Sequence, residues 1–192
     1  ANYRSLIVSR AYLGFALVVA FSYAGLFSFI SGSSFVLIDG LGVRPDRFGY
    51  FFAAVVIGYL AGTLIAGRLT LRLGILRMIP IGCAFQLAGG IAMLGFALTG
   101  AITRDAWGVA ALIGPMVCYM IGTGIAMPNA QAGAIGPFPR IAGAASALMG
   151  FLQMAIAAVA GIAFGQLHDG TALPMAGLIA LSAFATAACF AG

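Results

Sequence analysis

Long apolar runs alternate along the chain with short polar breaks that hold nearly all of its charged residues. Six such runs cover residues 11–38, 48–68, 78–99, 106–127, 142–165 and 173–191. About 20 apolar residues are enough to cross the hydrocarbon core of a bilayer as an α-helix. Membrane-spanning β-strands are about half that length and alternate apolar with polar side chains, which these runs do not do. The pattern therefore predicts an all-α integral membrane domain with six transmembrane helices.

The composition of the chain supports a lipid environment. Of 192 residues, 63% are hydrophobic and only 7% are charged, and the mean hydropathy is +1.13. A soluble domain carries about 25% charged residues, so this chain has too few polar groups to cover its own surface in water. The net charge of +5 comes from a few arginines near the ends of the runs. It therefore indicates membrane-flanking loops rather than a nucleic-acid partner, and a soluble binding module is excluded.

The arginines favour one orientation across the membrane. Loops rich in basic residues tend to stay on the cytoplasmic side. If the N-terminus of the segment is cytoplasmic, the inner segments hold Arg4, Arg10, Arg68, Arg72, Arg77 and Arg140, and the outer loops hold Arg44, Arg47 and Arg104. The excess of arginine thus predicts a cytoplasmic N-terminus.

The break between the second and third runs, "GRLTLRLGILR" (67–77), has a specific pattern of glycine and arginine. Gly67 permits close approach at a helix end, and Gly74 permits a tight turn. Three arginines can reach the carbonyl ends of helices and lipid phosphates at the membrane surface: Arg68, Arg72 and Arg77. Taken alone, the segment is equally well explained as a basic loop that stops transfer across the membrane.

This loop is similar to the second, degenerate copy of the loop signature of the major facilitator superfamily, found between its eighth and ninth spans. It departs from the fuller form because Leu71 stands where an Asp often stands, and Ile75 and Leu76 replace basic residues. Ser34 is a further departure, because the Bcr/CflA family of drug exporters, which the chain resembles in three stretches, often has a proline there. Three stretches resemble the Bcr/CflA family of drug exporters within that superfamily, in an order that fits spans seven to twelve: "FSFISGSSFVLIDGLGVRPDRFG" (27–49), "AGAASALMGFLQ" (142–153) and "LHDGTALPMAG" (167–177).

The resemblance implies that the chain is the C-terminal six-span half of a twelve-span transporter, whose N-terminal half is its partner. It implies a substrate site near the midplane between the halves and transport by alternating access. It also implies export of amphipathic drugs across a bacterial inner membrane, with the proton gradient as energy source and no cofactor. A six-span channel or a small homodimeric transporter is the alternative interpretation.

A six-span membrane enzyme is a further alternative from another functional class. It would need a constellation of His, Glu, Asp or Cys at membrane depth, whereas the acids of this chain all lie near the ends of the runs. His168 has no second His or Cys cluster with metal-ligand spacing, so no metal site is expected. We therefore expect neither catalytic nor metal-binding residues.

The first run contains small polar residues where lipid would favour apolar ones, in "FSFISGSSFVLI" (27–38). A serine hydroxyl can bond the carbonyl three or four residues earlier and bend the helix, and Gly32 lowers helix stiffness further. We expect a soft segment, which suits a gating helix or a cavity wall but also a helix that packs tightly on another. The candidate cavity residues in this run are Phe27, Ser31, Ser34 and Phe35.

Two later runs supply further candidates for an uncharged substrate surface. Flexible, polarisable thioethers suit loose recognition of varied apolar molecules, which singles out Met116, Tyr119 and Met120 in the fourth run. A neutral amide in mid-span needs a partner such as water or ligand, and Gln153 shares a helix face with two other candidates, Ser146 and Met149. Ordinary packing between helices is the alternative for each of these residues.

Three other polar residues have structural or protonic interpretations. Gln86 in the third run is expected to bond to a neighbouring helix. Pro128 and Asn129 are expected to end the fourth helix. Asp39 is a possible proton site because a carboxylate at membrane depth is costly and usually functional, although at the end of its run it can simply be hydrated.

Overall fold

The computed structural model describes residues 2–191, which are helical along almost their whole length. Its α-helices are α1 (Asn2–Val8), α2 (Arg10–Ser34), α3 (Pro45–Leu73), α4 (Ile75–Leu98), α5 (Ala106–Ile135), α6 (Ala142–Leu167) and α7 (Leu173–Ala191). A π-helical segment, η1 (Phe35–Gly40), continues α2, and a 3₁₀ turn, η2 (Pro139–Ile141), precedes α6. Six helices are long and apolar enough to cross a membrane, and residues 2–191 contain no strand. The predicted all-α class with six membrane helices is confirmed.

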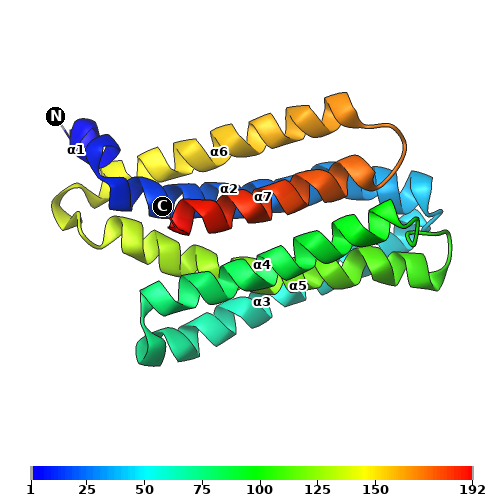
Figure 1. The fold of residues 1–192 in the computed structure, drawn as a ribbon, viewed down its shortest axis with the longest axis horizontal. Coiled ribbons are helices and arrows are strands. Elements are labelled where there is room, and N and C mark those ends of the chain that lie inside the picture. Colours follow the sequence, from blue (N-terminus) through cyan, green and yellow to red (C-terminus); the bar gives the residue numbers. More distant parts are fainter. Residues whose placement is uncertain (1, 192) are drawn as a thin grey trace.

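The helices pack in a pattern that repeats after three elements. α5 packs against α3 and α4, and α2 packs in the same way against α6 and α7. These two groups of three helices meet where α4 contacts α7 and where α2 contacts α5. Exchanging α2–α4 with α5–α7 therefore maps the set of contacts onto itself, as an internal three-helix repeat would. In Figure 1, α4 and α7 lie in front of α5 and α2, and α3 and α6 form opposite edges of the bundle.

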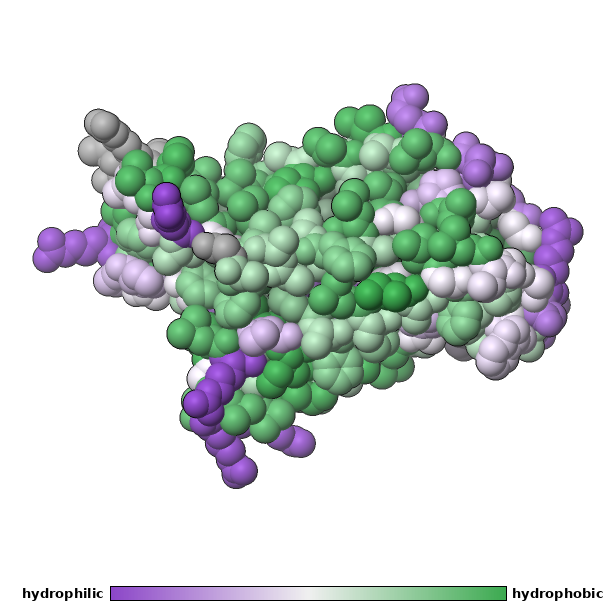
Figure 2. All heavy atoms as spheres, viewed as in Figure 1, coloured by the Kyte–Doolittle hydropathy of each residue, from purple (hydrophilic) through white to green (hydrophobic). Residues whose placement is uncertain are grey.

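The central helices are far more buried than the edge helices. In the most apolar window of each span, 67% of residues are buried in α5 and 50% in α2, against 17% in α3 and 22% in α6. α3 and α6 therefore each leave a long side uncovered by this chain. Figure 2 shows that the face formed by α4 and α7 is apolar between hydrophilic groups at the two ends of the bundle, as a lipid-facing surface would be.

A seam of small residues brings α3 and α5 into close contact. A Cβ atom on Gly58 would lie 2.9 Å from the carbonyl oxygen of Val117, and one on Gly62 would collide with the backbone of Ile121. Glycines spaced four apart occupy one side of a helix and allow two backbones to approach, which strengthens van der Waals packing where lipid removes the hydrophobic drive. This seam holds α3 against the core of the bundle.

Regular α-helical hydrogen bonding stops at the C-terminal end of α2, where η1 follows. The Ser28 hydroxyl donates to the Ala24 carbonyl oxygen at 2.9 Å, which is the back-bonding expected of serine in a helix. From Phe35 the chain becomes π-helical, and the Leu41 amide donates to the Val36 carbonyl oxygen at 2.8 Å. The irregular segment thus begins at Phe35, just beyond the serines on which the expectation of a soft segment rested.

The helix of the fourth run was expected to end at Pro128, and this prediction is wrong. That helix is α5, which continues through Pro128 to Ile135. Proline removes one backbone donor from a helix, and such a gap is tolerated in a membrane helix when side chains satisfy the freed groups. The Asn129 amide nitrogen donates to the Ile125 carbonyl oxygen at 2.8 Å, and its oxygen accepts a hydrogen bond from Thr70 at 2.9 Å. Asn129 therefore reinforces α5 and ties it to α3.

The segment 67–77 is almost entirely helical rather than a loop. α3 continues to Leu73, and only Gly74, with φ of 79°, separates it from α4. Such a positive φ is accessible to glycine at little cost, and it produces the sharp turn here. Gly67 lies inside α3, where a Cβ atom would meet nothing within 4 Å, so it marks neither a helix end nor a close approach.

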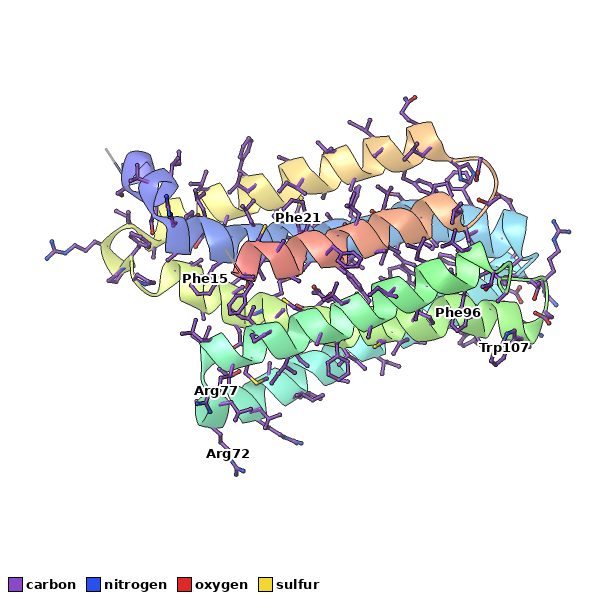
Figure 3. All side chains as sticks on the ribbon, viewed as in Figure 1. Phe15, Phe21, Arg72, Arg77, Phe96 and Trp107 are labelled. Carbon is purple, nitrogen blue, oxygen red and sulfur yellow. The ribbon has the colours of Figure 1, made fainter. Side chains whose placement is uncertain are left out.

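The two ends of the bundle differ in charge. The end where α3 turns into α4, hereafter the basic end, carries six arginines and no Asp: Arg4, Arg10, Arg68, Arg72, Arg77 and Arg140. The opposite end, hereafter the mixed end, carries the remaining three arginines and all four Asp: Arg44, Arg47, Arg104, Asp39, Asp46, Asp105 and Asp169. Figure 3 shows Arg72 and Arg77 at the basic end and Trp107 at the mixed end.

Candidate substrate groove

A groove of about 220 Å³ opens between α2 and α3. α5 forms its floor, and α4 and α7 contribute no residue to it. The lining is almost wholly apolar and consists of Tyr23, Leu26, Ile30, Phe52, Val55, Val56, Tyr59, Met120, Thr123 and Met127. Concave, mainly apolar sites with a few polar groups are typical of small-molecule binding. This groove is the candidate substrate surface of the chain.

Aromatic rings connect the two walls of the groove. Phe52 of α3 stacks on Phe29 of α2 with ring centroids 6.4 Å apart, and Phe48 stacks on Phe52 at 6.2 Å. The α3 wall was not among the predicted substrate residues. Its signal was the helical spacing of Phe48, Phe52, Val55 and Tyr59, which places all four side chains on one side of the second span. In an apolar run, however, such a stripe does not stand out from its lipid-facing neighbours.

The three candidates in the fourth span divide between the groove and the core. Met120 lines the groove floor, next to Thr123. Met116 and Tyr119 are fully buried, each at 0% exposure, and belong to the hydrophobic core of the bundle. These two residues therefore support the floor from behind rather than forming part of any surface in this conformation.

A buried polar cluster lies directly behind the groove floor. The Gln86 amide nitrogen of α4 donates to Ser22 Oγ at 2.9 Å and to Thr123 Oγ1 at 3.1 Å. Tyr119 donates its hydroxyl to the Ser22 carbonyl oxygen at 3.1 Å. The cluster thus joins α2, α4 and α5 at one point, and Gln86 bonds to neighbouring helices as expected. Thr123 belongs both to the cluster and to the groove lining.

Three candidates of the first run, Phe27, Ser31 and Phe35, face α6 rather than the groove. The ring of Phe27 packs against Gly161, and Ser31 lies beside the same glycine. Phe35 is 48% exposed, with its ring centroid 6.4 Å from Phe164 and 5.2 Å from His168. Phe27 and Ser31 of α2 and Phe35 of η1 therefore line the side that faces α6, and none of them lines the groove.

The two remaining candidates, Ser34 at the end of α2 and Asp39 in η1, are exposed. Ser34 is the last α-helical residue before η1, and Asp39 lies within η1 at the mixed end. Neither residue lines the groove. Among the side chains of residues 5–191, the only ion pair joins Arg44 Nε to Asp46 Oδ1 at 3.0 Å, so Asp39 pairs with no arginine of that range.

The three candidates on α6 have different surroundings. Ser146 is exposed and donates to the Ala142 carbonyl oxygen at 2.9 Å. Met149 is buried in a second apolar cluster near the basic end, together with Tyr12, whose hydroxyl donates to the Ala145 carbonyl oxygen. Gln153 is half-buried on the same helix. The structure thus brings one face of α6 toward α2 but does not bring these residues to the groove.

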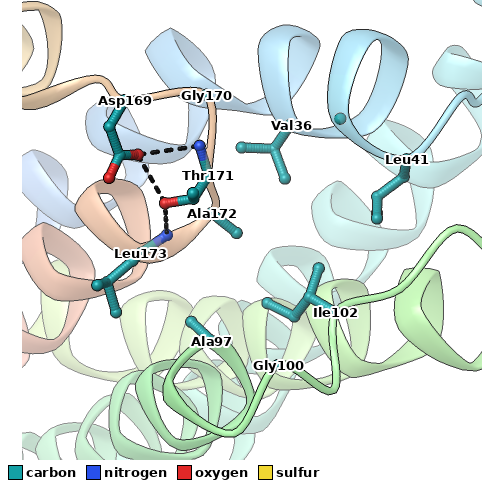
Figure 4. A pocket seen from close by; sticks show the side chains of 11 residues that line it. Val36, Leu41, Ala97, Gly100, Ile102, Asp169, Gly170, Thr171, Ala172 and Leu173 are labelled. Atoms are coloured by element: carbon teal, nitrogen blue, oxygen red, sulfur yellow. Dashed lines mark hydrogen bonds between the residues drawn. The ribbon is translucent and has the colours of Figure 1, made fainter.

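A second hollow, of about 410 Å³, lies at the mixed end (Figure 4) between η1, the α4–α5 connection and the α6–α7 turn. The Asp169 carboxylate accepts hydrogen bonds there from the Thr171 hydroxyl at 2.6 Å and the Thr171 amide at 2.9 Å. The Thr171 hydroxyl in turn accepts one from the Leu173 amide at 3.2 Å. The hydroxyl and the amide of Thr171 lower the pKa of Asp169, because both bonds stabilise the ionised form. These bonds order the turn that begins α7.

Comparison with known proteins places the chain among transporters. It is 30% identical over 178 residues to a bicyclomycin resistance protein homolog of Haemophilus influenzae, across 91% of this chain and 42% of the relative. It is 29% identical over 188 residues to the uncharacterised MFS-type transporter YdgK of Bacillus subtilis, across 98% of this chain and 45% of the relative. It is 27% identical over 155 residues to multidrug resistance protein D of Escherichia coli, across 79% of this chain and 37% of the relative.

These matches fall in the C-terminal halves of the relatives, so the chain spans less than half of their length. No protein-family model and no solved structure matches the chain. The six apolar helices and these relatives together show that the chain belongs to the major facilitator superfamily, where it corresponds to the C-terminal six-helix halves of Bcr/CflA-type relatives.

Proposed function

We propose that the chain is the C-terminal half of a proton-coupled exporter of amphipathic small molecules in a bacterial inner membrane. The observation that carries this proposal is the aromatic and methionine-lined groove between α2 and α3. The names of two relatives, one a bicyclomycin resistance protein homolog and one a multidrug resistance protein, support the substrate class.

The size of the groove favours a site shared with a second half. Sites for drug-sized molecules enclose roughly 300–1,000 Å³. The groove holds about 220 Å³ and is open on one side, so it supplies one wall of such a site. In our proposal an N-terminal six-helix half supplies the other wall, and access alternates as one half rocks against the other.

The side chains in the groove suit substrates with a large apolar part and few polar groups. Met120 and Met127 present flexible thioethers, and Tyr59 and Phe52 present ring faces. Such surfaces recognise classes of molecules rather than single compounds, because loss of one methylene changes binding by only about 1–3 kcal/mol. Thr123 is fully buried at the floor of the groove, where its hydroxyl donates to the Tyr119 carbonyl oxygen at 3.1 Å and accepts from Gln86, so it holds the floor in place.

The energy source in this proposal is the proton gradient, and no cofactor or catalytic residue is involved. All four Asp of the chain lie at the mixed end, and no Asp lines the groove. Asp39 is therefore the candidate proton site of this half, and any carboxylate at mid-membrane depth belongs to the N-terminal half. The basic end is assigned to the cytoplasm, since arginine-rich ends are retained on that side.

A measurement of drug accumulation tests this function. Cells that lack their main exporters express the full-length natural protein, and the retention of amphipathic antibiotics is followed with and without a protonophore. We expect reduced accumulation that the protonophore restores. Tyr59→Ala should impair export, whereas Leu181→Ala on α7, a substitution outside the groove, should not. Unchanged accumulation across the panel would instead favour a channel or a small homodimeric transporter.

A further inference from the structure

A second groove lies along the outer side of α3 near the basic end, and arginine lines part of it. Its volume is about 500 Å³, and its lining consists of Leu64, Ile65, Arg68, Leu69 and Arg72. Positions i, i+1, i+4, i+5 and i+8 of an α-helix share one side. All five lining side chains are exposed, whereas Gly58 and Gly62, nearer the middle of α3, pack against α5. The groove, called here the arginine groove, therefore faces away from the bundle.

The two arginines of this groove have no partner in the described chain. Both side chains are exposed, and neither makes an ion pair or a hydrogen bond with the side chains of residues 5–191. All four Asp lie at the opposite end of the bundle, so no Asp side chain of the described residues neutralises them. Two guanidinium groups four residues apart thus concentrate positive charge on one turn of α3. Charge complementarity calls for an anionic occupant.

The axial position of the arginine groove fits the boundary between lipid tails and headgroups. α3 has 29 residues and so extends about 43 Å, whereas the hydrocarbon core is about 30 Å thick. The last turns of α3 therefore lie at headgroup depth. Leu64 is 63% exposed and lies two turns closer to the membrane centre than Arg72, so the groove changes from apolar to cationic along the helix axis. Figure 3 shows Arg72 pointing away from the helices.

The end of α3 is held in place by contacts on its inner side. Thr70 donates its hydroxyl to Asn129 of α5 at 2.9 Å, and Ala66 is buried at 3% exposure. The backbone that carries Arg68 and Arg72 is thus anchored to the most buried helix of the bundle. An ordered scaffold reduces the entropy that an occupant must overcome when the two arginines close on it.

We propose that the arginine groove binds an anionic phospholipid, with its phosphate between Arg68 and Arg72 and an acyl chain along Leu64, Ile65 and Leu69. The planar guanidinium group matches phosphate oxygens with two parallel hydrogen bonds, which a lysine ammonium does not. A basic pocket beside transmembrane helices is a recognised site for lipid headgroups. Free phosphate would leave the apolar part of the groove unused, so the occupant is a membrane lipid.

Native mass spectrometry of the full-length protein in detergent, titrated with phosphatidylglycerol or phosphatidylcholine, tests this site. We expect a clear preference for phosphatidylglycerol. Arg68→Gln with Arg72→Gln should weaken its binding by about 30-fold, since two basic contacts at an anionic surface are lost. Arg44→Gln with Arg47→Gln removes the same charge at the mixed end and should change binding less than about threefold.

Two further measurements distinguish a bound lipid from a free anion. Arg68→Lys with Arg72→Lys keeps the charge but loses the planar guanidinium groups, so this variant should retain only part of the preference for phosphatidylglycerol. It also serves as the test if the variant with Arg68→Gln and Arg72→Gln does not fold. Leu64→Ser with Leu69→Ser should weaken lipid binding without affecting inorganic phosphate. Equal losses from both arginine pairs, or no loss from Arg68 and Arg72, would overturn the proposal. Displacement of the lipid by inorganic phosphate at similar concentration would also overturn it, since a free anion would then be the occupant.

Discussion

At the scale of single residues, a few polar side chains within an apolar bundle determine how its helices meet. Gln86 is fully buried and bonds to Ser22 of α2 and to Thr123 of α5. Lipid offers no water to replace such bonds, so a buried amide must find protein partners. This role could be predicted from the sequence, because a lone amide within a span has few other ways to be satisfied.

Substitution of Gln86 by Leu should destabilise the bundle. The change removes the hydrogen bonds that join Gln86 to Ser22 and Thr123 at similar side-chain volume. Buried bonds between membrane helices contribute about 0.6 kcal/mol each on average. We expect a loss of about 1–2 kcal/mol in the free energy of unfolding, because Ser22 and Thr123 are also left with unsatisfied groups. Gln153→Leu is the matched control and should be nearly neutral. Reversible unfolding in mixed micelles measures both variants, and equal stability of Gln86→Leu and the wild type would contradict this role.

Asp105 offers a residue-scale test outside the membrane spans. It is the N-cap of α5, and hydrogen bonds from the Thr103 hydroxyl and then the Gly108 amide lower its pKa below the ordinary 3.8. A lowered pKa in the folded state means that the cap stabilises the protein above pH 3.8 and loses this effect as the pH falls through the folded pKa. A carbon-13 titration should give a midpoint below 3.8, and Thr103→Val should move it upward. A midpoint at or above 3.8 in the wild type would be inconsistent with the cap.

The positions of the predicted substrate residues depend on how each helix is rotated about its own axis, which the sequence does not specify. Periodicity assigns Met116, Tyr119 and Met120 to one stretch of helix, but the side of that helix that faces the core depends on its neighbours. Here α4 covers Tyr119 and leaves Met120 to the groove. The rotation of a uniformly apolar helix about its own axis has almost no sequence signal. For this reason a groove wall on α3 was missed as well.

At the scale of the helices, glycine controls how closely elements pack, but only at certain positions. Gly62 and Gly67 lie on the same helix, α3, five residues apart. A Cβ atom on Gly62 would collide with the backbone of α5, whereas one on Gly67 would meet nothing within 4 Å. The sequence alone makes both look alike, because each is a glycine in an apolar helix.

These two glycines give a matched pair of substitutions. Gly62→Ala should separate α3 from α5 and cost about 1–3 kcal/mol of stability, as overpacking does. Gly67→Ala should stabilise the protein by about 0.5–1 kcal/mol, since alanine restricts the unfolded chain and favours helix. Thermal unfolding of the purified full-length protein compares them directly. Equal effects of the two substitutions would show that the seam does not control stability.

The existence of six helices could be predicted, but two of their ends could not. Hydropathy marks the part of a helix that lies in lipid, whereas α3 continues beyond it to Leu73 and α5 to Ile135. Pro128 favoured an end that does not occur, because the Asn129 side chain reinforces the next turn and bonds to α3. Such compensation depends on contacts between elements that are 59 residues apart.

At the scale of the whole molecule, the contacts of α2–α4 and α5–α7 repeat, and the two central helices are flanked by exposed edges. The relatives are more than twice as long as the matched segment. Both facts agree with a half that is completed by a second bundle. The groove between α2 and α3 would then face water and substrate. A separate hollow between α2, α6 and α7, lined by residues that include Phe21, Ile156 and Leu181, would face lipid.

Cysteine labelling of the full-length protein, with native cysteines replaced, tests this arrangement most directly. Ile30→Cys probes the rim of the substrate groove, and Leu181→Cys probes the hollow between α2, α6 and α7; the native side chains are 41% and 65% exposed. Maleimide reacts with the thiolate, which forms in water but not in lipid. We expect a water-soluble maleimide to label Ile30→Cys and not Leu181→Cys, and an amphipathic drug to slow the labelling. Labelling of Leu181→Cys alone, or of Ile30→Cys without any protection by drugs, would contradict a substrate groove between α2 and α3.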